Sequence, residues 1–71
     1  MGWCSGTDIF DEIVGVVLPM NSLPILDKKT LIKSLIEILW SHDWDCEYDS
    51  EYTQDNFVRL CFEELDFHFT D

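Results

Sequence analysis

The feature of this sequence that most restricts its fold is an apolar pattern at helical spacing in the middle of the chain. Between residues 31 and 39 the apolar positions follow a period near 3.6, at Leu31, Ile32, Leu35, Ile36, Ile38 and Leu39. The neighbouring lysines fall on the opposite face, and Asp27 is suited to be the N-cap. This pattern predicts an amphipathic helix from Asp27 to about His42 or Trp44.

Two flanking segments show the same spacing. Residues 7–18 carry a broad apolar stripe, with Ser5 or Thr7 as N-cap and Pro19 to end the helix. A third helix is expected from Thr53, its N-cap, with its stripe at Phe57, Val58, Cys61, Phe62 and Leu65. A chain of 71 residues can build one core but not two. We therefore expect a single all-α domain over residues 1–71, a small three-helix fold with an acidic loop before the third helix.

That loop alternates acidic residues with others from Asp43 to Tyr52. Strict alternation is also typical of a strand. We nevertheless predict a loop, because no other segment offers a strand to pair with and an isolated strand leaves its backbone groups unsatisfied.

Charge is distributed unevenly along the chain. Fifteen Asp and Glu against four Lys and Arg give a net charge of -11, and eleven of these acids but one base fall in residues 37–71. Such a chain is unsuited to direct contact with nucleic acid or with anionic lipid. The acids instead suit a basic protein partner. The candidate partner-binding residues are Asp43, Asp45, Glu47, Tyr48, Asp49, Glu51, Tyr52, Asp55, Glu63, Glu64 and Asp66.

Metal binding is a weaker alternative. Cys4, His42 and Cys46 are possible zinc ligands, and one helical turn would bring His42 and Cys46 together, but zinc sites usually have two closely spaced ligand pairs. The acids after residue 42 also resemble a calcium loop. However, the sixth position is Tyr48 instead of Gly and the twelfth is Gln54 instead of Glu. We expect no cofactor.

The cysteines favour a reducing compartment. Three cysteines are an odd number, which suits free thiols in a cytoplasm better than a disulfide framework, and no secretory signal or membrane helix is evident. Cys46 stands between Asp45 and Glu47, the opposite of the electropositive setting that activates a thiol. We do not expect an enzyme.

Two stretches resemble a family of small proteins encoded mainly by tailed bacteriophages. The opening, Met1-Gly2-Trp3-Cys4-Ser5-Gly6-Thr7-Asp8-Ile9-Phe10-Asp11, is similar to theirs, as are His42-Asp43-Trp44-Asp45-Cys46, Asp49-Ser50 and Tyr52. The sequence departs from the family after Tyr52. The resemblance implies a phage origin and a host bacterial cytoplasm but no mechanism, and it suggests that Trp3-Cys4 meets Trp44-Asp45-Cys46 in space.

These observations favour a phage-type interaction protein that inhibits a host nucleic-acid-handling protein, with spaced carboxylates imitating a phosphate array. One alternative is binding through an aromatic patch near Tyr48, Tyr52, Phe67 and Phe69. Another is the metal-stapled module. Self-association into a homodimer also stays open, because the first two helices are apolar beyond a narrow stripe. We expect Trp3 and Trp44 to staple the N-terminal segment onto the end of the second helix.

Overall fold

The computed structural model describes residues 3–69 and places three α-helices in this part of the chain. They are α1 (Ser5–Val17), α2 (Ile25–Trp40) and α3 (Asn56–Glu63). A short 3-10 helix, η1 (Glu47–Asp49), lies between α2 and α3, and no strand forms among residues 3–69. The prediction of a small all-α domain with an acidic loop before the third helix is confirmed.

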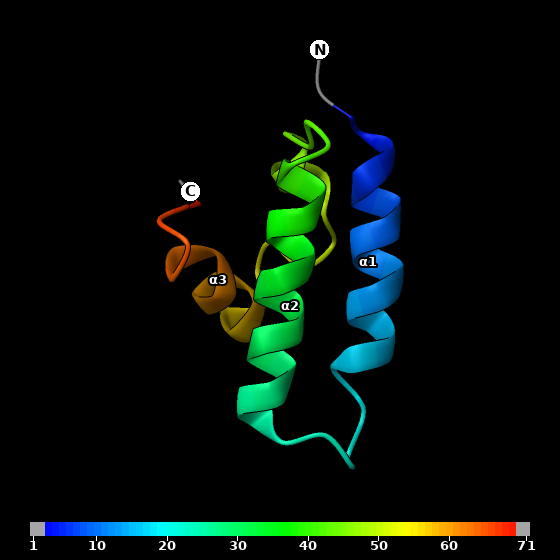
Figure 1. Cartoon of the computed structure of the whole chain (residues 1–71), viewed down its shortest axis with the longest axis vertical. Helices are drawn as coiled ribbons and strands as arrows, with labels where there is room; N and C mark the ends of the chain where they lie inside the picture. The colour runs from blue at the N-terminus through cyan, green and yellow to red at the C-terminus, as the bar shows by residue number, and fades with distance from the viewer. Residues whose placement is uncertain (1–2, 70–71) are drawn as a thin grey trace.

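The helix α2 is the centre of the arrangement. It forms an antiparallel hairpin with α1, and the shorter α3 packs against its other side (Figure 1). Residues 41–55, here called the connecting loop, join α2 to α3 and pass behind the hairpin in this view. The chain therefore returns toward α1 before it enters α3.

The helix starts differ from the predicted ones. α1 begins at Ser5 with Cys4 as N-cap, so neither Ser5 nor Thr7 caps it. α2 begins at Ile25, directly after Pro24, which puts Asp27 in its first turn. At neither start does the side chain of the N-cap residue accept a hydrogen bond from the helix.

The N-cap predicted for the third helix is also wrong. Asp55, not Thr53, caps α3, because its carboxylate accepts hydrogen bonds from the backbone N–H groups of Phe57 and Val58 at 2.9 and 3.0 Å. A carboxylate at this position satisfies two amides that lack a helical partner. Asp55 therefore has a structural role at the start of α3.

Aromatic rings form the middle of the core. Phe10 of α1 and Phe62 of α3 are fully buried with ring centroids 5.6 Å apart, and the buried ring of Trp44 lies 5.1 Å from that of Phe10. Trp3 lies at the edge, where its backbone N–H donates to the carbonyl of Asp43 at 2.8 Å. Both tryptophans thus tie the N-terminal segment to residues after α2. The other buried apolar residues are Val14, Val17, Ile32, Ile36, Leu39, Val58 and Cys61.

The apolar stripe of α1 is only partly covered. Phe10, Val14 and Val17 are buried, whereas Ile9, Ile13 and Val16 are exposed. The reason is the position of α3, which packs on α2 and leaves one side of the α1–α2 hairpin open.

Candidate functional site

The connecting loop is fixed onto α1 by hydrogen bonds, one of which is buried. The indole N–H of Trp44 donates to the hydroxyl of Thr7 at 3.0 Å, and that hydroxyl donates to the carbonyl of Cys46 at 2.9 Å. One turn further along α1, Asp11 accepts from the Ser50 hydroxyl at 2.5 Å and from the backbone N–H of Glu51 at 3.1 Å. The acids of this loop are therefore held in place before any partner arrives.

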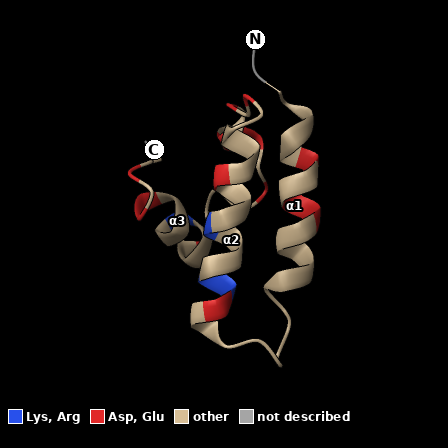
Figure 2. Ribbon diagram, in the orientation of Figure 1, with Lys and Arg blue, Asp and Glu red and all other residues tan. Residues whose placement is uncertain are grey.

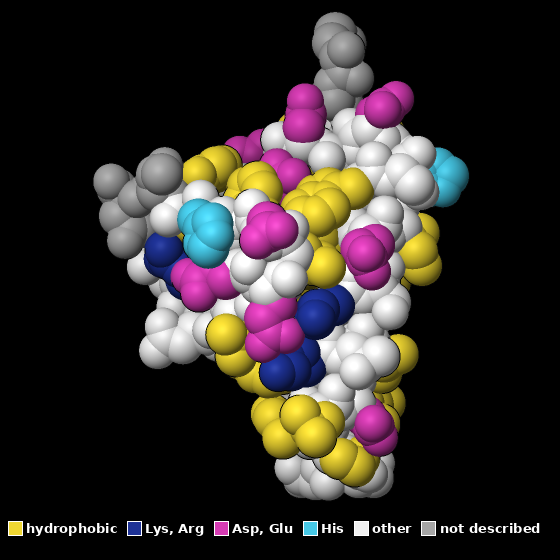
Figure 3. Space-filling model, turned by 60° about the vertical axis from the view of Figure 1, so that its left-hand side comes forward, with side chains coloured by type: hydrophobic (Ala, Val, Ile, Leu, Met, Phe, Trp, Pro, Cys, Tyr) yellow, Lys and Arg dark blue, Asp and Glu magenta, His cyan; other side chains and the backbone are white. Residues whose placement is uncertain are grey.

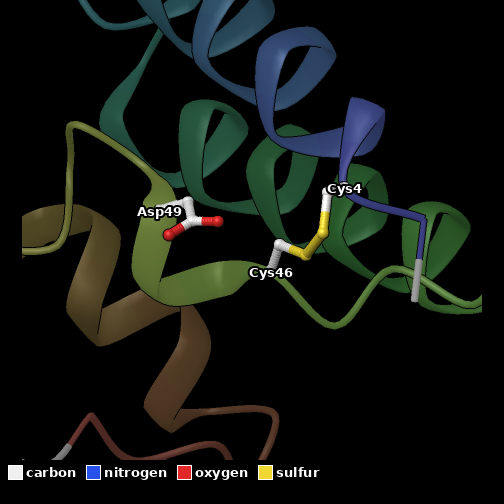
Figure 4. A group of neighbouring side chains, drawn as sticks. All are labelled: Cys4, Cys46 and Asp49. Atoms are coloured by element: carbon white, nitrogen blue, oxygen red, sulfur yellow. A yellow bond between two sulfur atoms is a disulfide. The ribbon is translucent and has the colours of Figure 1, made fainter. Parts of the chain in front are cut away.

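A disulfide between Cys4 and Cys46 adds a covalent link at the same place (Figure 4). The prediction of free thiols is wrong for this pair. The Thr7 and Trp44 bonds bring the loop back to the first turn of α1, where the two Cα atoms lie 5.2 Å apart, within the range of protein disulfides. Cys61 is buried and free, and burial raises the pKa of its thiol to about 11. The Cys61 thiol is thus protonated at neutral pH.

The predicted metal set does not come together. α2 ends at Trp40, so His42 and Cys46 do not share a helical face, and the ring of His42 lies 5.9 Å from that of Trp3. Asp49 takes the place of His42 beside the two cysteines, with all three ligand atoms within 4.8 Å of one another. The disulfide occupies both sulfur atoms, so this group is a cross-link and not a thiolate centre.

Three of the predicted partner-binding acids have internal roles. Glu47 is buried, and its carboxylate accepts from the indole N–H of Trp40 at 2.7 Å. Asp55 caps α3, as described above. Glu64 binds the ammonium groups of Lys29 and Lys33 at 3.0 and 3.1 Å, and these hydrogen bonds lower the pKa of its carboxyl group. Figure 3 shows such a contact between basic side chains (dark blue) and an acidic side chain (magenta) near the centre of the view.

The remaining predicted acids divide between two places. Asp43, Asp45, Asp49 and Glu51 are exposed on the connecting loop. Glu63 and Asp66 are exposed at the end of α3.

A concave acidic surface forms where the connecting loop meets α1. Asp8, Asp11, Glu12 and Glu51 line a hollow of about 410 Å³, here called the acidic hollow. Figure 2 shows acidic positions along α1 and around the loop, whereas the basic positions lie on α2 and α3. The candidate partner-binding residues named from the sequence include no acid of α1, so sequence reasoning missed this surface. The spacing of Asp8, Asp11 and Glu12 places them on one side of a helix, but it does not show that Glu51 joins them.

Tyr52 lies beside the acidic hollow. Burial raises the pKa of its phenol, and the charges of Glu51, Asp11 and Asp55 raise it further. Its hydroxyl is also close to α1, since a Cβ added at Gly15 would lie 3.2 Å from it. The potential at this edge of the molecule is therefore negative.

The predicted aromatic patch is split in two. Tyr48 is 53% exposed and packs against Phe67 and Phe69, with ring centroids 6.1 and 5.1 Å away. Tyr52 lies instead against α1. Of the four rings in the predicted patch, those of Tyr48, Phe67 and Phe69 lie together and that of Tyr52 lies apart.

Within residues 3–69, no helix has the length and apolar character needed to cross a membrane. No protein-family model, curated protein or solved structure matches this chain. The resemblance to small phage proteins therefore stays a prediction from the residues that carry it.

Proposed function

We propose that this protein is an acidic interaction protein that binds a basic surface on a nucleic-acid-handling protein and competes there with nucleic acid. The observation that carries the proposal is the acidic hollow, in which α1 and the connecting loop bring four carboxylates together. A cleft that binds phosphates presents clustered Lys and Arg, and it is attracted to a fixed carboxylate array for the same electrostatic reason.

Two features of the molecule support this proposal. Both ion pairs among the described residues involve Glu64, on the α2–α3 side, so they leave the carboxylates of the hollow un-neutralised. The loop that carries Glu51, Asp45 and Asp49 is also fixed by the Asp11 and Thr7 hydrogen bonds. A fixed array loses less conformational entropy on binding than a mobile acidic tail.

The opening sequence and the His42–Cys46 segment, which resemble those of small tailed-phage proteins, suggest the setting. We place the protein in a host bacterial cytoplasm, with a host protein as its target. Binding would block that target by covering its nucleic-acid site and would need no catalysis.

Capture from a bacterial lysate tests the proposal. Tagged wild-type protein is compared with Asp8→Asn/Glu51→Gln, which removes two charges from the acidic hollow, and with Glu63→Gln/Asp66→Asn, which removes two charges outside it. We expect the wild type and the control to retain a nucleic-acid-handling protein at low salt and to release it at high salt. The variant Asp8→Asn/Glu51→Gln should fail to retain that protein. A partner that is equally reduced in both variants, or one that resists the salt wash, would contradict the proposal.

The second candidate function uses the aromatic surface around Tyr48. The observation that favours this function is the contact among the rings of Tyr48, Phe67 and Phe69. The Tyr48 side chain is more than half exposed, so a partner can reach it. Tyr and Trp side chains are typical anchors of protein interfaces. In that case Tyr48→Ala would abolish capture while Asp8→Asn/Glu51→Gln would leave it intact.

A further inference from the structure

The disulfide between Cys4 and Cys46 stands beside carboxylates that can bind a metal ion. A carboxylate oxygen of Asp49 and the two sulfur atoms all lie within 4.8 Å of one another, and Figure 4 shows that carboxylate on the side of the sulfurs. An oxygen of the Asp45 carboxylate lies 3.4 Å from the sulfur of Cys46. Cys4 and Asp49 are exposed and Cys46 is partly buried, so solvent reaches this group. Two sulfur and two oxygen donors thus meet at one accessible place.

These donors are held together by contacts that do not involve the S–S bond. The Thr7 hydroxyl donates to the carbonyl of Cys46 at 2.9 Å, and the backbone N–H of Asp49 donates to the same carbonyl at 3.1 Å. Asp49 follows Cys46 by three positions through η1, and side chains three positions apart in a 3-10 helix eclipse each other. Cys4 is the N-cap of α1, the helix that carries Thr7. Opening the disulfide therefore leaves both thiols and Asp49 as neighbours.

Reduction makes the two sulfur atoms available as ligands. A cellular dithiol supplies two electrons and two protons to the S–S bond, which gives thiols at Cys4 and Cys46 and leaves the dithiol as a disulfide. The two sulfurs then move apart by rotation about their Cα–Cβ bonds. With the Cα atoms 5.2 Å apart, both sulfurs can reach one ion at the zinc–sulfur distance of about 2.3 Å.

We propose that the reduced protein binds one zinc ion through the thiolates of Cys4 and Cys46 and the carboxylate of Asp49, with Asp45 or a water molecule as the fourth ligand. Zinc displaces the two thiol protons as it binds, so charge is balanced. It accepts sulfur and oxygen ligands together in a tetrahedral site, whereas magnesium and calcium take oxygen ligands. The ion takes over the link between α1 and the connecting loop when the disulfide is reduced.

The charge around this site favours a cation. Asp43, Asp45 and Asp49 are exposed on the connecting loop, and neither α1 nor that loop contains Lys or Arg. Lys29 and Lys33 pair with Glu64 on the α2–α3 side. Two thiolates would add negative charge to this place, and a divalent cation offsets it. The inference takes only a reducing setting from the proposed function, and it can be tested without a partner.

Zinc titration of the full chain tests the inference. The protein is reduced with a phosphine without oxygen, and its zinc affinity is measured by competition with a chromophoric chelator, beside that of the disulfide form. We expect one zinc per reduced chain in native mass spectrometry and an affinity at least about a hundredfold above that of the disulfide form. Cobalt(II) in place of zinc should give a thiolate-to-cobalt charge-transfer band in the reduced form alone. Equal zinc affinity of the two forms, or a cobalt spectrum without that band, would overturn the inference.

Variants identify the ligands. Asp49→Asn keeps both cysteines and should weaken zinc binding by the reduced protein at least about tenfold, and Cys4→Ser should weaken it further. Cys61→Ala and Glu63→Gln are the controls and should stay within about twofold of the wild type, because Cys61 is buried and free and Glu63 lies at the end of α3.

The melting temperature gives a second readout. Zinc should raise that of the reduced wild type more than that of reduced Asp49→Asn, because an ion that binds the folded state stabilises it in proportion to its affinity. Circular dichroism shows that each variant is folded. An unchanged zinc affinity in Asp49→Asn would overturn the assigned site. Partner capture in the presence of a chelator measures the proposed function separately, so the two can fail independently.

Discussion

At the scale of single residues, Trp44 shows how one side chain joins distant parts of this chain. Its ring is buried against Phe10 and Phe62, and its indole N–H donates to Thr7. This packing requires the backbone of α1 to approach the ring closely. Gly6 permits that approach, because a Cβ at this position would lie 2.8 Å from Cδ1 of Trp44.

Gly6→Ala should therefore destabilise the fold. The added methyl group forces the Trp44 ring to move, which disturbs its hydrogen bond to Thr7, and overpacking of this kind costs about 1–3 kcal/mol. Urea unfolding measures the loss. Gly15→Ala is the matched control, since its Cβ would meet only the Tyr52 hydroxyl at 3.2 Å and alanine favours the helix by about 1 kcal/mol. A Gly6→Ala protein as stable as Gly15→Ala would contradict the assigned packing.

Glu64 should titrate at a lower pH than an ordinary glutamate. Hydrogen bonds from Lys29 and Lys33 lower the pKa of this carboxyl group from its usual 4.5. The stability that it contributes is thus complete above the unfolded-state pKa and is lost as the pH falls through the lower folded-state pKa. An NMR titration of the Glu64 side chain checks this. In Lys29→Gln/Lys33→Gln the midpoint should rise toward 4.5, and no rise would contradict the ion-pair assignment.

At the scale of elements, the connecting loop is held to α1 by the disulfide and by two independent sets of hydrogen bonds. Thr7 and Trp44 form the first set, and Asp11 and Ser50 form the second. The loop should keep its position without the covalent link. This matters for a protein that we place in a reducing cytoplasm.

We expect Cys4→Ser/Cys46→Ser to remain folded. Loss of the disulfide should lower the free energy of unfolding by about 2–4 kcal/mol, mainly through the unfolded state. Trp44 should stay buried, which amide exchange and the emission of the tryptophans report. The contrary result is a variant that keeps its helical circular dichroism but in which Trp44 emits like a solvated indole. That result would show that the disulfide alone holds the loop.

The helices were predictable from sequence because their signals are local. The 3.6-residue pattern identified α2, and Pro19 lies just beyond the end of α1. The contacts of the loop were not predictable, since Thr7 and Cys46, like Asp11 and Ser50, are 39 positions apart. For the same reason the spacing of the acids could not show that Glu47 is buried or that Asp8 and Glu12 join Glu51 in one hollow.

At the scale of the whole molecule, two kinds of surface lie on different sides of a small fold. The acidic hollow lies where α1 meets the connecting loop. An apolar groove lies on the open side of the hairpin, lined by Ile13, Val17, Leu31, Ile32, Ser34, Leu35 and Ile38. Basic charge is concentrated on α2 and α3, where Lys29 and Lys33 pair with Glu64. This separation leaves the hollow negative, which the proposed competition with nucleic acid requires.

The measurement that tests this account most directly is a competition assay with the captured partner. The partner is bound to fluorescently labelled DNA or RNA, and the protein is titrated into that complex at two salt concentrations. We predict that wild-type protein releases the nucleic acid, that Asp8→Asn/Glu51→Gln releases it far less well, and that the affinity of the protein falls as salt rises. A ternary complex that retains the nucleic acid, or an affinity independent of salt, would contradict the account.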